Sequence, residues 1–162
     1  MLSKIKQRKE EGFTIIEVMI VLAIAGLIIL VVLLAIPALQ RNSRNTTIKN
    51  DASAVAGAIQ EYLGANNGKL PTGVATVGTD GTVEVTGSGG KTTGKVKAGT
   101  EVSTSTTTIG STKDDTGKIV VVLQRKCNDA GTDFESNVNK RSIAILYNVE
   151  TSGTPVKNCT DA

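Results

Sequence analysis

An uninterrupted apolar run near the N-terminus constrains the fold of this chain more than any other feature. Residues 18–36, VMIVLAIAGLIILVVLLAI, form 19 positions without a charge. A helix needs about 20 apolar residues to cross a hydrocarbon core of about 30 Å, so this run predicts one transmembrane helix. Four basic residues precede it: Lys4, Lys6, Arg8 and Lys9. The positive-inside rule therefore predicts a cytoplasmic N-terminus and an exported remainder, although Arg41 and Arg44 on the far side weaken this asymmetry.

Composition limits what the exported part can do. The 162 residues leave room for one modest domain beyond the membrane segment. From Arg41 onward there are 14 basic and 12 acidic residues, a balance that argues against a nucleic-acid-binding domain. The chain has no histidine, which excludes histidine-based catalysis and His-ligated metals. It also has no P-loop, zinc-ligand spacing or GxSxG motif, so we expect no enzyme, no metal site and no cofactor.

The junction before the apolar run, EEGFTIIEV, contains the carboxylate of Glu17. An ionised carboxylate in hydrocarbon costs several kcal/mol unless it is paired. A secretory signal has an apolar region of about 7 to 15 residues and then a small-residue cleavage site, but this run is longer and no convincing site follows. A plain single-pass anchor explains the run and its basic flank. It leaves Glu17 and the Gly12–Phe13 junction unexplained.

The segment KIKQRKEEGFTIIEVMIVLAIAGLI resembles the leader of a type IV prepilin. It has a short basic stretch, then Gly12, Phe13 and Thr14, and then Glu17 four residues after the phenylalanine. The resemblance implies that a prepilin peptidase cuts between Gly12 and Phe13 and methylates the new N-terminus of Phe13. It also implies that an assembly ATPase and a membrane platform protein build the subunit into a helical filament.

Cleavage would create the partner that Glu17 needs. The α-amine of Phe13 would be positively charged near neutral pH and would lie one helical turn from Glu17. We therefore expect Glu17, next to Thr14, to act in assembly by pairing with this amine, within one chain or between neighbouring subunits. In the alternative interpretation, Glu17 simply occupies the first turn of the helix, where the helix dipole favours a negative charge.

The helix is predicted to continue beyond the apolar run. Ile48, Ala52, Val55, Ile59 and Leu63 recur at helical spacing, and GANNG (residues 64–68) is suited to end the helix. Pro37 is predicted to kink it. We therefore expect a leader at 1–12, a transmembrane and filament-core helix at 13–39, and an amphipathic continuation at 40–66.

The remaining chain divides into a polar segment and a β-rich segment. Residues 67–117 are rich in Thr, Gly and Ser and are predicted to form a variable loop with some edge strands, such as 82–86. Residues 118–127 and 141–150 predict two antiparallel strands that cover the helix stripe, with Phe134 at the edge of the core. Cys127 and Cys159 suggest one disulfide if the region is exported, the alternative being two free thiols. Residues 118–162 would then form a sheet and a disulfide-bounded C-terminal segment.

Together these features predict an α+β, pilin-like fold: a long N-terminal helix, transmembrane in its first half, packed on a small antiparallel sheet. The resemblance implies a pilin, a structural subunit of a type IV pilus-like filament that serves adhesion, twitching motility or DNA uptake. The subunit would lie in the cytoplasmic membrane among lipids and then in an extracellular homo-oligomeric filament, with DNA or a host surface as candidate outer partners. The alternatives are a pseudopilin of a type II secretion or competence system and a membrane-anchored binding module.

Overall fold

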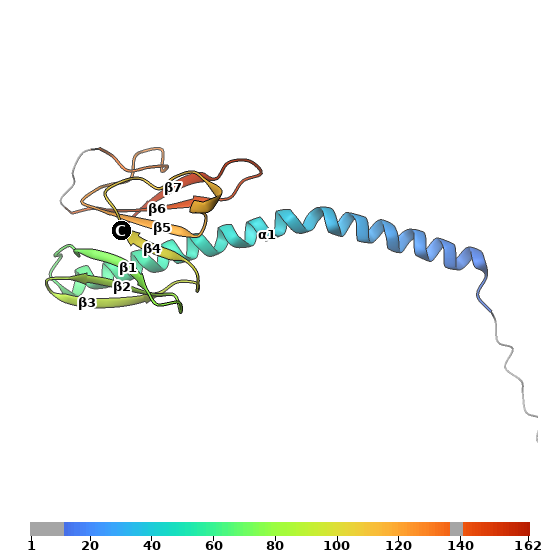
Figure 1. Cartoon of the computed structure of the whole chain (residues 1–162), viewed down its shortest axis with the longest axis horizontal. Helices are drawn as coiled ribbons and strands as arrows, with labels where there is room; N and C mark the ends of the chain where they lie inside the picture. Colours follow the sequence, from blue (N-terminus) through green and yellow to red (C-terminus); the bar gives the residue numbers. More distant parts are fainter. Residues whose placement is uncertain (1–11, 137–140) are drawn as a thin grey trace, which may run out of the picture. The chain divides into compact units, whose positions relative to one another are not determined.

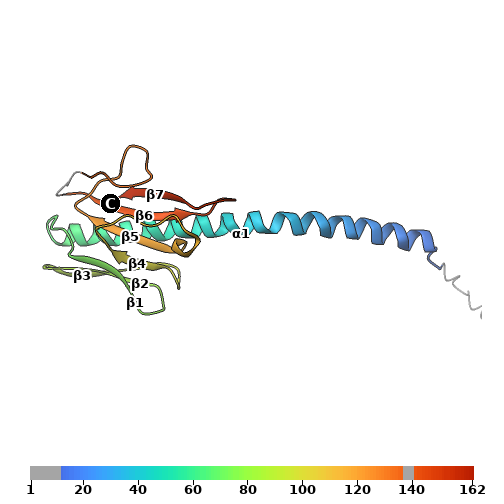
Figure 2. The ribbon, with the colours of Figure 1, turned by 45° about the horizontal axis from the view of Figure 1, so that its top comes forward.

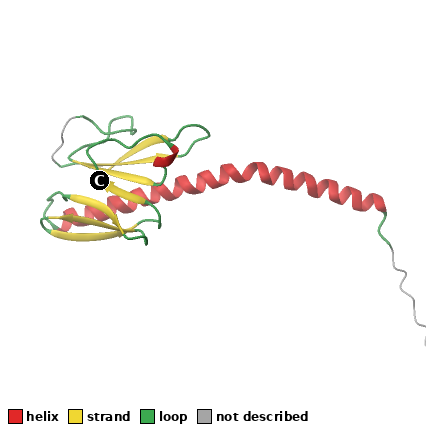
Figure 3. Ribbon diagram, in the orientation of Figure 1, coloured by secondary structure: helices red, strands yellow, loops and turns green. Residues whose placement is uncertain are grey.

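The computed structural model describes residues 12–136 and 141–162. These residues form an α+β structure of one long helix, α1 (Ile15–Ala65), seven strands and a short 3₁₀ helix, η1 (Lys113–Asp115) (Figure 3). The chain divides into two compact units, Met1–Leu39 and Gln40–Ala162. The expected α+β, pilin-like class is therefore confirmed.

The described part of the first unit consists of residues 12–14 and the N-terminal portion of α1. Its large apolar side chains are all exposed, from 39% at Ile36 to 86% at Phe13. In the described residues, α1 is the one helix long and apolar enough to cross a membrane. A helix that is apolar on every side needs an apolar environment, either lipid or other helices. Pro37 lies inside α1, which is assigned as helix through that position, and the kink stays a prediction.

The rest of α1 belongs to the second unit and presents one buried face. The predicted stripe is confirmed at Ile48, Ala52, Val55 and Ile59. Its last member, Leu63, is half-buried and packs against the core, and the neighbouring Tyr62 is fully buried. Steps of four, three, four and three follow the 3.6-residue period more closely than the expected final step of four.

The helix ends in the predicted GANNG segment. The backbone N–H of Gly68 donates to the carbonyl of Leu63 at 2.8 Å, and Asn67 between them has a positive φ of 53°. A six-to-one hydrogen bond around a left-handed residue is the Schellman arrangement, which satisfies a carbonyl that the helix leaves free. Asparagine tolerates this conformation better than most residues.

The Thr/Gly-rich segment is more ordered than the loop that we expected. It contains an antiparallel sheet of β1 (Gly73–Val77), β2 (Thr82–Gly87) and β3 (Gly90–Lys95), in that order. The physical reason lies in β2, where buried Val83 and Val85 alternate with more exposed residues and so give the sheet an apolar face. The two valines of β2 are a weak signal in a sequence dominated by Thr and Gly.

A second sheet contains β4 (Glu101–Thr104), β5 (Lys118–Leu123), β6 (Ile143–Val149) and β7 (Val156–Asp161), in that order. The predicted antiparallel pairing of β5 with β6 is confirmed. However, β4 lies parallel to β5, so this sheet is mixed rather than purely antiparallel. Figures 1 and 2 show the two sheets as separate groups of strands beside the second half of α1.

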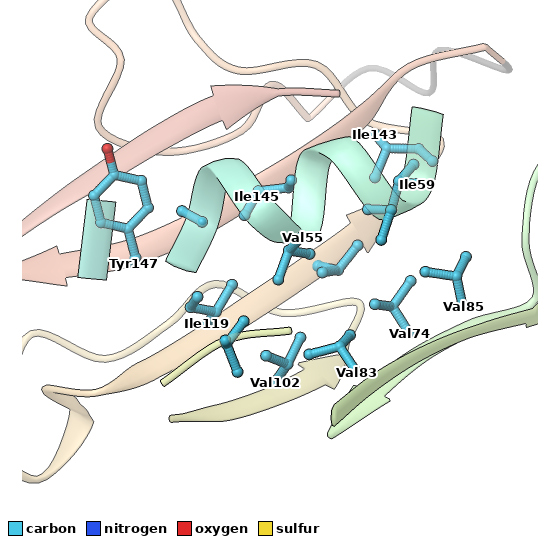
Figure 4. Packing of buried hydrophobic residues seen from close by; sticks show 14 of the residues in the cluster. Val55, Ile59, Val74, Val83, Val85, Val102, Ile119, Ile143, Ile145 and Tyr147 are labelled. Carbon is cyan, nitrogen blue, oxygen red and sulfur yellow. The ribbon is translucent and has the colours of Figure 1, made fainter. Parts of the chain in front are cut away.

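One hydrophobic core joins α1 to both sheets. Figure 4 shows Val55 and Ile59 of the helix among Val83 and Val85 of the first sheet and Ile145 of the second. All five side chains are at most 1% exposed. Their burial is the main source of stability of the second unit.

Threonine side chains join the two sheets where β1 lies beside β4. Thr76 of β1 accepts a hydrogen bond from the N–H of Val102 at 2.7 Å and donates to the carbonyl of Thr100 at 3.2 Å. Thr104 of β4 accepts from the N–H of Val74 at 2.6 Å and donates to its carbonyl at 3.0 Å. The hydroxyls therefore replace the backbone ladder between these strands, satisfying groups that would otherwise lose their water without a partner.

Candidate functional site

The start of α1 brings together two of the predicted site residues. Thr14 precedes the helix, and its hydroxyl accepts a 3.3 Å hydrogen bond from the N–H of Glu17. In return, Oε2 of Glu17 accepts from the N–H of Thr14 at 2.9 Å and from its hydroxyl at 2.8 Å. This reciprocal pair is a capping box, in which a Thr and a Glu three residues later satisfy free donors of the first turn.

The capping box gives Glu17 a second role, as a helix cap, beside the charge pairing predicted from the sequence. Its carboxylate lies in the first turn, where the helix dipole stabilises negative charge, as the alternative interpretation had it. Only Oε2 accepts these bonds, and among the described residues no hydrogen bond to Oε1 is present. The cap therefore leaves one carboxylate oxygen available for a further donor. The TxxE pattern in the sequence was the signal for this cap.

The predicted cleavage junction lies just before the cap. Phe13 is 86% exposed, and no neighbouring atom lies within 4 Å of the position that a Cβ on Gly12 would take. No described side chain therefore covers the Gly12–Phe13 peptide bond on the side of Gly12, and Phe13 itself is exposed. The basic residues of the leader lie outside the described residues.

The second predicted site, the cysteine pair, forms a disulfide. Cys127 and Cys159 are bonded with a Cα–Cα distance of 5.6 Å, which confirms the pairing. The link is reinforced by hydrogen bonds, because the N–H of Cys127 donates to Asp161 at 2.7 Å and that of Cys159 to the carbonyl of Gly131 at 2.8 Å. The disulfide therefore joins the segment after β5 to the C-terminal strand β7.

Polar and aromatic contacts hold the loop that follows Cys127. Phe134 packs against a small second core that includes Val122 and Leu146, not at the edge of the helix-facing core as predicted, and the guanidinium of Arg125 lies 5.7 Å from its ring centroid. Asp133 accepts hydrogen bonds from Lys157 at 2.7 Å and from Thr108 at 2.8 Å. Burial opposes the ionisation of Asp133, but these hydrogen bonds outweigh it and lower the pKa of the carboxyl.

Two polar side chains that no sequence pattern indicated lie in the core of the second unit. Asp51, in the buried face of α1, accepts a hydrogen bond from the N–H of Lys97 at 2.9 Å and another from the hydroxyl of Thr100 at 2.6 Å. Asn148 of β6 donates to the carbonyl of Gly110 at 2.7 Å. Both anchor loops to regular elements, and their partners are too distant in sequence for a local pattern to show.

The comparisons with known proteins concern the N-terminal site. Residues 7–33 match the family described as the prokaryotic N-terminal methylation motif. The chain carries a class III prepilin leader. This prepilin leader belongs to type IV pilins and pseudopilins, which are structural rather than catalytic proteins. The leader and the apolar helix of the prepilin together fit membrane anchoring. Searches among curated proteins and among solved structures gave no match.

Proposed function

We propose that this prepilin is the structural subunit of a type IV pilus-like filament. The observation that carries the proposal is the match at residues 7–33 together with a helix whose apolar side chains remain exposed on every side up to Leu39. Such a surface is unstable in water. Lipid would cover it before assembly, and like helices in a bundle would cover it afterwards.

Processing would start the assembly. A prepilin peptidase would cut between Gly12 and Phe13 and methylate Phe13, and the exposed junction supports access to this bond. The new α-amine would then approach the free Oε1 of Glu17, either in its own chain or in a neighbouring subunit. Pairing would neutralise a carboxylate that hydrocarbon otherwise disfavours, and it would set the register between helices.

The exported domain would form the outer surface of the filament. In this proposal the segment 67–117 is the variable surface, and the disulfide-bonded C-terminal segment is held rigid for contacts. The assembly ATPase and the membrane platform protein would act on the membrane-embedded subunit. Adhesion, twitching motility and DNA uptake are the roles that such filaments serve.

N-terminal sequencing of the mature protein from its own cells tests the first step. We expect the mature chain to begin at an N-methylated Phe13. A chain that begins at Met1 would make the protein a plain membrane anchor and would overturn the proposal.

Electron microscopy of the same cells separates a pilus from a pseudopilus. Long surface filaments that contain this chain, and that vanish when its gene is deleted, are the expected result. Short periplasmic fibres next to a secretin would instead identify a pseudopilin of a secretion or competence system, which has the same leader.

A further inference from the structure

A basic cavity lies at the start of the second unit. It has a volume of about 320 Å³, within the range of roughly 300 to 1,000 Å³ that is typical of ligand sites. Its lining combines α1, η1 and the loop between β6 and β7. The lining includes the cationic side chains of Arg41, Arg44 and Lys113. The loop adds the carboxylate of Glu150 and the hydroxyls of Thr151 and Ser152.

The charges in this cavity do not balance. Arg44 is neutralised by Glu150, which accepts two hydrogen bonds of 2.7 Å from the guanidinium. In the described part of the chain, neither Arg41 nor Lys113 forms an ion pair. The remaining lining residues are neutral, so the cavity has an excess of two positive charges. It is therefore suited to an anion.

The donor set favours a phosphate group among the anions. The guanidinium of Arg41 offers a planar fork of N–H donors that matches phosphate oxygens, and the ammonium of Lys113 offers a mobile point charge. The hydroxyl of Ser152 supplies a neutral donor at the rim, whereas that of Thr151 already donates to the carbonyl of Thr154 at 2.7 Å. Charge-assisted hydrogen bonds of this kind are about twice as strong as neutral ones.

The place of Arg41 along α1 indicates where such a phosphate would come from. Arg41 follows the charge-free run, which ends at Ile36, by five residues, and the last exposed apolar side chain of the helix, Leu39, by two. At 1.5 Å per residue these separations are about 7.5 and 3 Å. The headgroup layer adds about 5 to 8 Å on each side of a 30 Å hydrocarbon core. Arg41 therefore falls within the headgroup layer, which contains the lipid phosphates, on the exported side.

We propose that this cavity binds the headgroup phosphate of an anionic phospholipid in the outer leaflet of the cytoplasmic membrane before the subunit is assembled. The proposal rests on the single-pass orientation in the proposed function, and goes beyond it by assigning a lipid ligand. It also accounts for Arg41 and Arg44, which the positive-inside rule disfavours on the exported side. Release of the lipid would accompany extraction of the subunit into the filament.

The test uses the full-length chain, purified in an uncharged detergent and titrated with phosphatidylglycerol, with binding followed by native mass spectrometry. The variant R41Q/K113Q removes the two unpaired charges and keeps the Arg44–Glu150 pair. The control K69Q/K126Q removes the same charge from two exposed lysines. Neither lysine lines this cavity, and neither forms an ion pair in the described residues. Thermal unfolding and thiol alkylation check that both variants fold.

We expect R41Q/K113Q to bind phosphatidylglycerol about 30-fold more weakly, since each basic residue near a lipid surface contributes a factor of about five and the two factors multiply. K69Q/K126Q should bind like the unaltered chain. Zwitterionic phosphatidylcholine should bind more weakly than phosphatidylglycerol to the unaltered chain. Equal affinity of both variants for phosphatidylglycerol would overturn the proposal.

Two further measurements distinguish a bound lipid from other occupants of the cavity. Inorganic phosphate that displaces phosphatidylglycerol completely at equal concentration would identify a free-phosphate site and overturn the proposal. Normal lipid binding by R41Q/K113Q, combined with loss of filaments, would identify a contact between subunits and also overturn it. Because N-terminal sequencing reports on processing separately, either result can be distinguished from a failure of the proposed pilus function.

Discussion

Arg44 and Glu150 form a bidentate ion pair although they lie 106 residues apart in the chain. Nε and Nη2 of the arginine donate to Oε1 and Oε2 of the glutamate, both at 2.7 Å. Asn45 extends this contact, because its side chain accepts from the N–H of Glu150 at 2.7 Å and donates to its carbonyl at 2.8 Å. These bonds connect α1 to the residue that follows β6.

The ion pair makes stability depend on pH. Hydrogen bonds from Arg44 lower the pKa of Glu150 below its ordinary value. The pair therefore stabilises the folded state above the unfolded pKa of about 4.3, and this stability is lost as the pH falls through the lowered folded pKa. Since Arg44 is 52% exposed, solvent screens the pair and its contribution is small. Urea unfolding should show Glu150→Gln less stable than the unaltered chain at neutral pH, with the difference shrinking in acid.

The matched control for this experiment is Glu61→Gln, an exposed position of α1 with no ion pair in the described residues. It should show no such loss. A destabilisation by Glu150→Gln that stays constant down to the most acidic pH would contradict the electrostatic explanation.

Thr76 of β1 and Thr104 of β4 form the hydrogen bonds that join the two sheets, which we call the threonine seam. Removing one hydroxyl from this seam is expected to lower stability strongly. Thr76→Val keeps the shape but removes the hydroxyl, leaving the N–H of Val102 and the carbonyl of Thr100 without their partner. An unsatisfied buried group costs about 1 to 3 kcal/mol, so we expect a loss of that size in the free energy of unfolding. Thr93→Val, at an exposed position of β3 without a side-chain hydrogen bond in the described residues, should leave it nearly unchanged. Equal effects would show that the seam adds no stability.

Two glycines should respond to alanine in opposite directions. A Cβ at Gly87 would overlap the hydroxyl of Tyr62, whose ring is fully buried and cannot move aside. Gly87→Ala should therefore destabilise the protein by about 1 to 3 kcal/mol, as overpacking does. Gly57 lies on the exposed face of α1, where an added Cβ would meet no other atom within 4 Å, so Gly57→Ala should stabilise the protein by about 0.5 to 1 kcal/mol. Thermal unfolding of the two variants checks the signs, and a common sign would contradict this packing.

The disulfide should be complete and should contribute to stability. Mass spectrometry after alkylation without reductant should find no modified thiol, and two after reduction. The double variant C127S/C159S should lose about 2 to 4 kcal/mol, because the bond closes a loop across 32 positions and restricts the unfolded chain. Two alkylations before reduction would show that the thiols are free.

Glu17 should be needed for assembly rather than for processing. Glu17→Ala removes both the cap of α1 and the free Oε1, while the Gly12–Phe13 junction is unchanged. We expect cells with this variant to cut the leader and insert the subunit, yet to form few or no filaments. Glu17→Gln separates the two roles, because its amide oxygen can still cap the helix but carries no charge. Normal filament yield from processed Glu17→Ala would remove Glu17 from the assembly mechanism.

The features that the sequence alone determined are local. The apolar run at 18–36, the stripe on α1 and the GANNG cap each repeat or end at the spacing of a helix, so neighbouring residues are enough to predict them. The TxxE capping box at Thr14 and Glu17 was equally local and could have been predicted. The prepilin leader was recognised for the same reason, since its junction and its acid lie within a few residues of each other.

The features that only the tertiary structure decided depend on distant segments. Tyr62, next to half-buried Leu63, is the fully buried residue at the end of the α1 stripe, and β4 pairs in parallel with β5. The Thr76 seam and the basic cavity at Arg41 likewise combine residues from separate elements. No local pattern encodes such contacts, because the free energy that selects them comes from burying groups that meet only when the chain has folded.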